Sequence, residues 1–573
     1  MEVSNVIAID IFYIVSFLGV LLLLAIPLGD FMASVFNGRQ TLMTFLLRPI
    51  ESGIYRFCRI DENQEMSWKE YSFAFIVFNV IGLFVLFILQ LMQGCLPLNP
   101  MGFGPVRWDT ALNTAISFVT NTNWQAYGGE TTMSYLTQMM GMTVQNFVSA
   151  AVGIAVALPL VRAFTYKLKD TIGNFWVDMT RSVLYVLLPL SILLAMLLVA
   201  QGVVQTYSPS VKVQTVEGVE QAIAVGPVAS QIAIKQLGSN GGGFFNANSG
   251  HPFENPTPFS NFLEMLAILL IPVALPLTFG RMVNNRSQGS AIFAAMMILF
   301  MIGLGISLWS EWQGNPLLSK LGIAGGTNME GKEVRFGIGP SALWGQATTV
   351  TSNGSVNSMH DSMMPLTSLI FMFNMAIGEV IFGGVGVGLI GMLTYVILAM
   401  FLAGLMIGRT PEFLGKKLEA REMIMAVIVV IAPAIASLIF AGIAVATPIG
   451  LGSLNNDGPH GLSEILYAFF SAAGNNGSAF AGLNVNTVFY NLTLGLVMLI
   501  GRFLTILPAL AIAGSLAAKK IVPPSSATFP TASPLFTALL IGVVLIVGAL
   551  TFFPSLVLGP FIEHLLILSG RTF

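Results

Sequence analysis

The amino-acid sequence predicts an all-α, polytopic membrane protein with about ten transmembrane helices. The first observation is composition: the 573-residue chain is 55% hydrophobic and only 9% charged, whereas a soluble domain carries about 25% charged residues. Because this small number of charged residues cannot cover a water-facing surface, lipid must surround most of the chain. The second observation is that apolar stretches of about 20 residues recur along the sequence. The third is a polar cluster that recurs four times between these stretches.

Ten stretches are long and apolar enough to span a bilayer as helices. They cover residues 6–28, 71–95, 142–163, 174–203, 260–280, 289–312, 364–408, 422–447, 487–513 and 534–558. The first has no basic segment before it, so we interpret it as a retained helix and not as a cleaved signal peptide. The stretch 364–408 is too long for one simple span and is interrupted by Gly383-Gly384-Val385-Gly386-Val387-Gly388.

Lysine and arginine residues gather in alternate loops, which indicates the orientation of the chain. They are Arg39, Arg48, Arg56, Arg59, Lys69, Arg162, Lys167, Lys169, Arg281, Arg286, Arg409, Lys416, Lys417, Arg421, Lys519 and Lys520. The positive-inside rule assigns these loops to the cytoplasm, so both termini are predicted to be extracytoplasmic. Cys58 and Cys95 then lie on opposite sides of the membrane and cannot form a disulfide. The net charge of −2 suggests no nucleic-acid partner, and membrane lipid is the expected surrounding.

Four of the external segments share one pattern, a short and partly apolar run followed by a small polar cluster. The segments cover residues 108–125, 226–246, 341–357 and 462–480. The aligned clusters are Thr120-Asn121-Thr122, Ser239-Asn240-Gly241, Ser352-Asn353-Gly354 and Asn475-Asn476-Gly477. Their third residues follow one another at nearly constant spacing, as in an internal repeat. In this alignment the first repeat carries Thr122 where the other three carry glycine.

Each cluster lies between two predicted spans, so the repeating unit is a span, a short pore helix, a polar loop and a second span. We therefore expect four pseudo-repeated units around a central selectivity filter, with one extra helix at each end. The expected divisions are an extra N-terminal helix at 1–30, pore repeats at 71–163, 174–280, 289–408 (with a broken second helix) and 422–513, and an extra C-terminal helix at 534–558.

The residue types in the clusters suit a filter for a dehydrated cation. A run of about 12 residues is too short to cross the bilayer, and non-helical backbone is tolerated at that depth only where it lines a cavity. Glycine lets carbonyl groups point inward at backbone angles that a side chain would oppose. A ring of carbonyls can replace the water shell of an ion, and helix C-termini favour a cation. One such cluster alone would be an ordinary polar outer loop; four in register favour a filter.

Several long and compositionally unusual stretches carry a resemblance to a known family. They cover residues 113–135, 237–258, 329–337, 359–362, 377–389, 404–417 and 475–483. In them the chain resembles the KdpA family, the potassium-translocating A subunit of the bacterial Kdp P-type ATPase, which is similar in plan to the Trk, Ktr and HKT potassium transporters. The resemblance implies potassium as the transported ligand, a place in the bacterial inner membrane, and the partners KdpB (the ATPase), KdpC and KdpF. It also implies that ions leave the filter by a tunnel into KdpB.

The sequence contains no catalytic signature of its own. It lacks the Asp-Lys-Thr-Gly phosphorylation motif, and its nearest phosphate-loop match, Gly326 to Glu333, ends in glutamate where serine or threonine should bind magnesium. We therefore expect a non-hydrolytic subunit that binds no nucleotide, with the loop 409–422 as a docking surface for a partner.

Three alternatives remain. A stand-alone Trk-like channel or transporter shares the filter. A membrane enzyme would need carboxylates or histidines clustered at one cavity, and the sequence shows none. A secondary transporter would predict two inverted halves.

Further residues are candidates for controlling ion passage. Gln125 lies just beyond the first cluster and resembles the family's pore-mouth glutamine; the alternative is that it only braces the loop. Gly383, Gly384 and Gly386 form a glycine break that could act as an internal gate or as a flexible kink. Glu379 precedes this break, and Arg502 lies inside the ninth span. Charged residues at membrane depth are functional candidates, and these two could form an ion pair. Glu264 is expected to be solvated near the cytoplasm.

Overall fold

The protein is a bundle of long helices, seen here in a computed structural model that describes residues 3–322, 326–408, 410–523 and 529–571. Among these residues, ten helices are long and apolar enough to cross a membrane. All ten overlap the predicted spans, so the predicted fold class is confirmed. Residues 1–2 of the first predicted segment, and Arg409 of the predicted docking loop, lie outside the described residues.

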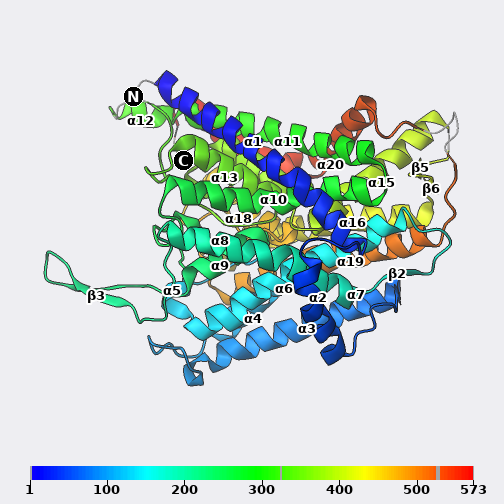
Figure 1. The fold of residues 1–573 in the computed structure, drawn as a ribbon. Coiled ribbons are helices and arrows are strands. Elements are labelled where there is room, and N and C mark those ends of the chain that lie inside the picture. The colour runs from blue at the N-terminus through cyan, green and yellow to red at the C-terminus, as the bar shows by residue number, and fades with distance from the viewer. Residues whose placement is uncertain (1–2, 323–325, 409, 524–528, 572–573) are drawn as a thin grey trace.

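The ten long segments run side by side in the bundle (Figure 1). They are α1 (Val3–Phe36), α3 (Trp68–Met92), α6 (Val144–Ala163) with the π-helical turn η2 (Thr137–Thr143) before it, α7 (Phe175–Arg181) continued by η3 (Ser182–Leu187) and α8 (Leu188–Ala200), α10 (Pro258–Met282), α11 (Arg286–Gln313), α15 (Val387–Ile407), α16 (Ala420–Ala446), α19 (Val488–Ala517), and α20 (Pro534–Leu556) continued by η6 (Val557–Phe561) and α21 (Ile562–Leu568).

Shorter helices fill the space between the spans and cover the ends of the bundle. They are α2 (Thr44–Cys58), η1 (Gln93–Cys95), α4 (Trp108–Val119), α5 (Gly129–Thr132), α9 (Val228–Leu237), η4 (Asn248–Gly250), α12 (Pro316–Lys320), α13 (Ile338–Val350), η5 (His360–Ser362), α14 (Pro365–Ala376), α17 (Pro448–Leu451) and α18 (Gly458–Gly474). Four of them, α4, α9, α13 and α18, coincide with the short runs that precede the polar clusters.

The described residues also form three two-stranded antiparallel sheets, which the sequence did not predict. Their strands are β1 (Met66–Ser67) with β2 (Thr171–Gly173), β3 (Val211–Gln214) with β4 (Glu220–Ile223), and β5 (Glu412–Phe413) with β6 (Lys416–Lys417). The β3–β4 hairpin projects from one end of the bundle, the end at which the chain termini also lie (Figure 1).

Local capping signals explain where several spans begin. At α3 the Ser67 hydroxyl accepts a hydrogen bond from the Glu70 amide, and the Glu70 carboxylate accepts one from the Ser67 amide. Thr257 and Ser260 exchange the same two bonds at the start of α10. This reciprocal cap satisfies amides that have no partner within the helix.

The predicted interruption in the long stretch 364–408 begins earlier than the glycine run. Helix α14 ends at Ala376 and α15 starts at Val387, so Glu379 lies inside the break and not before it, which corrects the prediction. The reason is conformational: Gly378, Glu379, Phe382 and Gly383 all adopt positive φ angles, and a right-handed helix cannot accommodate such residues.

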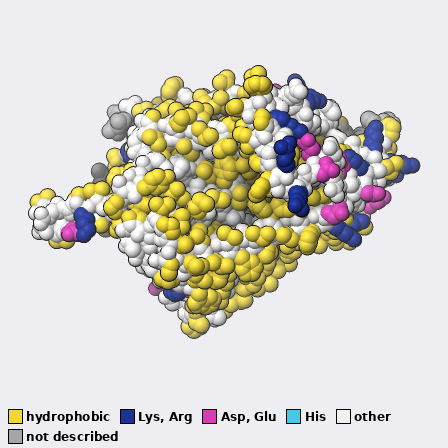
Figure 2. All heavy atoms as spheres, turned by 60° about the horizontal axis from the view of Figure 1, so that its bottom comes forward, with side chains coloured by type: hydrophobic (Ala, Val, Ile, Leu, Met, Phe, Trp, Pro, Cys, Tyr) yellow, Lys and Arg dark blue, Asp and Glu magenta, His cyan; other side chains and the backbone are white. Residues whose placement is uncertain are grey.

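The surface of the bundle matches a lipid environment. Figure 2 shows hydrophobic side chains spread over the flank of the molecule, with lysine, arginine and acidic side chains gathered at the end away from the projecting hairpin. Strands β2, β5 and β6 lie toward that charged end (Figure 1). A wide apolar flank without charge is what hydrocarbon chains require.

Candidate functional site

The four polar clusters meet in the middle of the bundle, where α4, α9, α13 and α18 end. In each loop one residue adopts a left-handed conformation, with φ between 50° and 67°: Asn121, Ser239, Ser352 and Asn475. The amide of the next residue then donates back to a carbonyl in the last turn of the short helix. These bonds are Thr122 to Ser117 (2.9 Å), Asn240 to Lys235 (2.8 Å), Asn353 to Thr348 (3.2 Å) and Asn476 to Ser471 (2.8 Å).

This shared turn corrects the alignment of the first cluster by one residue. Thr122 is equivalent to Asn240, Asn353 and Asn476, so the residue that stands in place of glycine is Asn123 and not Thr122. Asn123 has a φ of 55°, and Gly354 and Gly477 are also left-handed at 82° and 102°. Asparagine tolerates this region better than other residues with a side chain. The likeness of Thr-Asn-Thr to Ser-Asn-Gly concealed the backbone register.

Hydrogen bonds join neighbouring loops into a closed ring. Asn240 Nδ2 donates to Asn121 Oδ1 (2.7 Å), joining the second loop to the first. Asn353 Nδ2 donates to Gln236 Oε1 (3.3 Å), joining the third repeat to the second.

Asn476 Nδ2 then donates to the carbonyl of Thr348 (2.8 Å), joining the fourth repeat to the third. Asn475 Nδ2 donates to Thr122 Oγ1 (3.0 Å) and closes the ring between the fourth and first loops. Each of the three equivalent asparagines therefore reaches the preceding repeat.

The glycines let the loop backbones touch. A Cβ atom added to Gly241 would overlap the carbonyl of Asn353, and one added to Gly354 would overlap the carbonyl of Asn476. A Cβ atom added to Gly477 would overlap the carbonyl of Thr122. These contacts follow the same cyclic order as the hydrogen bonds. The close approach of neighbouring loop backbones in the ring therefore explains why these three positions are glycine.

A buried polar shell supports the second loop, and sequence reasoning missed it. Lys235 and Glu254 form an ion pair of 2.8 Å, and neither side chain is exposed. Lys235 Nζ also donates to Asn248 Oδ1 (2.6 Å), and Asn248 Nδ2 donates to the carbonyl of Gly241 (2.5 Å). The charge on α9 thus orients a backbone carbonyl of the ring through one intervening side chain. A lysine within an apolar short helix was the available signal.

Glu264 also belongs to this shell, which corrects its expected place in solvent. It is fully buried near the start of α10, and its carboxylate accepts from Gln236 Nε2 and Ser249 Oγ, each at 2.8 Å. Because α10 begins beside the second loop, its first turns lie next to the ring and not at the charged end of the bundle.

His251 lies in the segment that follows the second loop, directly after η4. Its imidazole ring stacks on Phe245 with centroids 3.8 Å apart and planes inclined by 4°. Burial lowers the pKa of His251 from its usual value, and nearby Glu254, Arg335 and Glu333 act as smaller influences. The lowered pKa favours the neutral form of the stacked ring.

Gln125 connects the first and second loops just beyond the ring. Its Nε2 donates to the carbonyl of Gly243 and its Oε1 accepts from the amide of Gly243, both at 3.0 Å. The nitrogen and the oxygen of the Gln125 side-chain amide are therefore both bonded to the backbone of Gly243. This contact fits the bracing alternative and leaves Gln125 beside the ring, where it was predicted to be.

The interrupted helix lies against the third and fourth loops. The amide of Gly383 donates to the carbonyl of Val350, the last residue of α13 (2.7 Å). Ser352 lies close to Gly384, and the carbonyl of Gly153 in α6 lies against Gly386. The three glycines thus let the broken segment pack closely between the pore helix of repeat three and its neighbours.

Glu379 and Arg502 are both buried, but they do not form the predicted ion pair. Arg502 Nη2 instead donates to the carbonyl of Ser149 in α6 (3.2 Å). Among the described residues, no ion pair includes either side chain. The guanidinium finds its partner on the neighbouring helix because backbone carbonyls there are closer than the broken segment's carboxylate.

A small cavity lies beside the third and fourth loops. Its volume is about 50 Å³, and its walls include Ser352, Gly378, Val387, Gly474 and Asn475. A volume of this size holds a few water molecules. The cavity therefore extends from two of the four loops to the break between α14 and α15.

The weak phosphate-loop match has a different role. Lys332 forms a 2.8 Å ion pair with Glu311 of α11, and neither side chain is exposed. The lysine that would contact a phosphate is therefore committed to a buried carboxylate.

Comparison with known proteins places these features in a family. Residues 15–565 match the family model described as KdpA, potassium-transporting ATPase A subunit. A protein of Brucella anthropi is 57% identical over 560 residues, which cover 98% of this chain and 99% of that protein. A protein of Sorangium cellulosum is 58% identical over 566 residues, covering 96% and 97%. Both are named potassium-transporting ATPase potassium-binding subunit.

The fold is also similar to a solved structure with little sequence likeness. The potassium transporter TrkH from Vibrio parahaemolyticus superimposes with a TM-score of 0.51, over 85% of this chain and 95% of that one, at 15% identity. This similarity concerns the arrangement of helices alone.

Proposed function

Because the chain belongs to the KdpA family of potassium-transporting ATPase A subunits, we propose that its ring of four loops is a potassium selectivity filter. The observation that carries this proposal is the closed ring. Gly241, Gly354 and Gly477 each bring their loop backbone against the next loop, and the Asn240 side chain donates to Asn121 and Asn123 of the first loop. The filter residues are Thr120, Asn121, Thr122, Asn123, Ser239, Asn240, Gly241, Ser352, Asn353, Gly354, Asn475, Asn476 and Gly477.

The chemistry of the ring suits a dehydrated monovalent cation. Backbone carbonyls supply partial negative charge without a fixed anion, so the ion can bind and leave again. Four short helices end at the ring, and their C-terminal dipoles favour positive charge there. The side chains that join the loops keep these carbonyls at fixed spacing. Gln125 stands at the mouth of the filter, where it braces the first two loops.

We further propose that potassium leaves the filter beside the broken helix and passes to a P-type ATPase partner, KdpB, with KdpC and KdpF completing the complex. The small cavity between the third and fourth loops and the α14–α15 break supports this route. Glu379 would attract the ion there, Gly383, Gly384 and Gly386 would form the gate, and Arg502 would repel it from α6. The chain itself would hydrolyse no ATP and bind no nucleotide.

The proposed setting is the bacterial inner membrane, with the charged end of the bundle in the cytoplasm. Both termini would then be extracytoplasmic, because they lie at the opposite end of the bundle with the β3–β4 hairpin. The proposed divisions are the extra helices at 1–30 and 534–558 and the four pore repeats at 71–163, 174–280, 289–408 and 422–513. The loop 409–422, at the charged end, is the proposed docking surface for the partner.

The second candidate is a stand-alone potassium transporter, which the structural similarity to TrkH favours. Both candidates use the same filter and differ in whether ATP hydrolysis drives the ion. The test is potassium-stimulated ATP hydrolysis by the complex purified through this subunit, for the native chain and for two glycine variants.

The first variant is Gly477→Ala, which places a methyl group against the carbonyl of Thr122. Its matched control is Gly337→Ala, since Gly337 also has a positive φ, 79°, but has open space around its Cβ position. We expect the potassium concentration for half-maximal stimulation to rise about tenfold or more in Gly477→Ala and to change less than about twofold in the control. If this potassium concentration rose equally in the two variants, the ring of loops would not be the selectivity filter.

The source of energy is tested in the same preparation. If no ATPase activity co-purifies and reconstituted vesicles pass potassium down its gradient, the stand-alone transporter replaces the pump subunit.

A further inference from the structure

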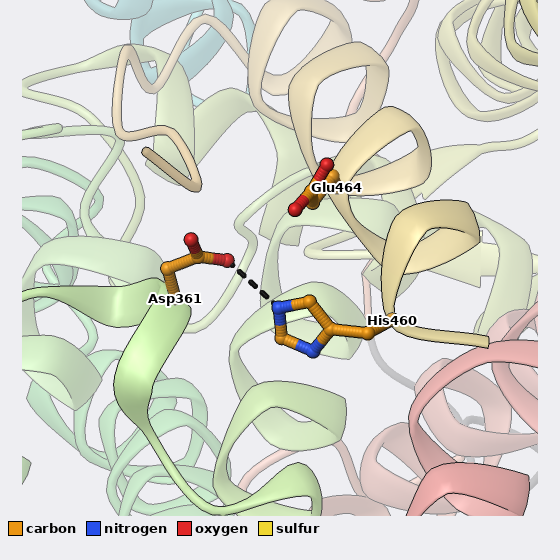
Figure 3. A group of neighbouring side chains, drawn as sticks. All are labelled: Asp361, His460 and Glu464. Carbon is orange, nitrogen blue, oxygen red and sulfur yellow. Dashed lines mark hydrogen bonds and ion pairs between the residues drawn. The ribbon is translucent and has the colours of Figure 1, made fainter. Parts of the chain in front are cut away.

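A cluster of acidic and imidazole side chains lies apart from the ring of loops, and the sequence analysis did not predict it. Asp361 lies in η5, after the third loop, while His460 and Glu464 lie one turn apart at the start of α18. Figure 3 shows that the three side chains face a common gap. Asp361 and His460 are 99 positions apart in the chain, so only the fold brings these ligands together.

The geometry of the cluster is compatible with a metal site. One ligand atom from each of Asp361, His460 and Glu464 lies within 4.8 Å of the others. Imidazole Nε2 of His460 is 3.0 Å from Asp361 Oδ1. Bonds of about 2.0–2.2 Å to zinc place tetrahedral ligand atoms about 3.3–3.6 Å apart. The three side chains therefore need only small rotations to enclose one ion.

Glu464 supplies an independent sign that the cluster can bind a cation. Its side chain is fully buried, and Oε1 accepts from Asn456 Nδ2 at 2.7 Å. Its second oxygen, Oε2, is buried and has no hydrogen-bond partner among the described residues. A buried carboxylate oxygen without a partner costs free energy, and a bound cation in the gap would satisfy it.

Neighbouring groups hold His460 and Asp361 in place. Glu563 of α21 lies 2.9 Å from His460 Nδ1, so the imidazole can donate from Nδ1 and offer Nε2 to a metal that replaces the present contact of Nε2 with Asp361 Oδ1. A carboxylate behind a ligating histidine fixes its tautomer and orientation in many metal sites. The other oxygen of Asp361 accepts from the amide of Gly482 at 2.9 Å.

We propose that Asp361, His460 and Glu464 bind one zinc ion, with Glu563 as the positioning residue behind the histidine and water as the fourth ligand. An imidazole with carboxylates suits zinc and disfavours magnesium and calcium, which take oxygen ligands alone. Asp361, His460 and Glu563 also line a cavity of about 470 Å³, which gives a hydrated ion access. The proposal does not rest on the proposed function.

Zinc bound here would join three segments that meet outside the ring. It would tie η5, which follows the third loop, to α18, which precedes the fourth loop, and through Glu563 to the C-terminal helix. His360, next to Asp361, contacts Tyr467 of α18, with Nδ1 2.7 Å from its hydroxyl. The Tyr467 hydroxyl lies 2.9 Å from Ser478 Oγ, beside Gly477 of the ring.

The test is zinc binding to the purified, chelator-treated full-length protein in detergent, measured by equilibrium dialysis against zinc chloride. We expect one zinc per chain, at least about a hundredfold weaker binding in Glu464→Gln, and unchanged binding in Asp457→Asn. Asp457 is an exposed carboxylate lining the same cavity, so it is the matched control. Glu563→Gln should weaken binding about tenfold or more, because it acts through the histidine.

X-ray absorption at the zinc edge of the native protein tests the ligand set without any variant. We expect a shell of nitrogen and oxygen atoms with one imidazole and no sulfur, which also separates this site from Cys58 and Cys95. Retention of zinc by Glu464→Gln, a sulfur shell, or no zinc above the buffer control would each overturn the proposal. In the last case the cluster is a set of hydrogen-bonded ion pairs only.

Discussion

The Nζ atom of Lys235 lies 2.8 Å from Oε2 of Glu254, and both side chains are wholly enclosed by protein. The lysine also donates to Asn248, which in turn donates to the carbonyl of Gly241 in the ring of loops. A buried ion pair costs desolvation, and removing one partner leaves an uncompensated charge. This pair therefore connects the stability of the second repeat with the position of one ring carbonyl.

Replacing Lys235 by methionine should lower the free energy of unfolding by about 3–5 kcal/mol, because Glu254 then remains buried without its counter-ion. The measurement is denaturant-induced unfolding of the purified protein. The control is Lys212→Met in the projecting hairpin, where the pair with Glu220 is 74% and 66% exposed. That change should cost at most about 1 kcal/mol, and equal losses in the two variants would contradict the prediction.

The corrected register of the first loop makes a separate prediction for Thr122→Gly. If Thr122 stood in the glycine position, this change would make the four loops alike and be tolerated. Because its hydroxyl instead accepts from Asn475, the change should open the ring and weaken potassium affinity about tenfold. Potassium-stimulated ATP hydrolysis measures it, with Thr131→Gly on the exposed α5 as the control. Unchanged affinity in Thr122→Gly would reject the structural register.

Acidification should loosen the segment behind the second loop. Burial lowers the pKa of His251 below its unfolded value of 6.5, so the folded protein binds this proton less readily than the unfolded chain. Its contribution to stability is full above about pH 6.5 and is lost as the pH falls below that value. The unfolding temperature between pH 7.5 and 5 should drop less in His251→Gln than in the native protein; parallel curves would show that His251 is not involved.

Glu379 and Arg502 should act independently, since the structure does not pair them. The effects of Glu379→Gln and Arg502→Met on unfolding free energy should add to within about 0.5 kcal/mol in the double variant. A direct buried pair would instead give a larger interaction energy in this double-mutant cycle. The measurement is denaturant unfolding of the two single variants and the double variant, and a large coupling would restore the ion pair predicted from the sequence.

The ten spans could be predicted because each depends only on the length and composition of one continuous stretch. The repeated polar clusters were also visible, and the loops they form do meet. The register of the first loop was not predictable, because Asn123 replaces glycine through its backbone conformation and not through its size. Lys235 with Glu254, and Asp361 with His460, were missed because each pair depends on how the intervening chain folds, over 19 positions in the first pair and 99 in the second.

The closing bond of the ring has a consequence for how the protein is made. Asn475 and Thr122, which form it, are 353 positions apart. At a synthesis rate of about 5–20 residues per second, the first loop waits roughly 20–70 seconds for its last neighbour. During that time its polar backbone lies at membrane depth with one side open, where hydrocarbon cannot satisfy it. We therefore expect water or an insertion factor to shelter the unfinished ring until the fourth repeat enters the bilayer.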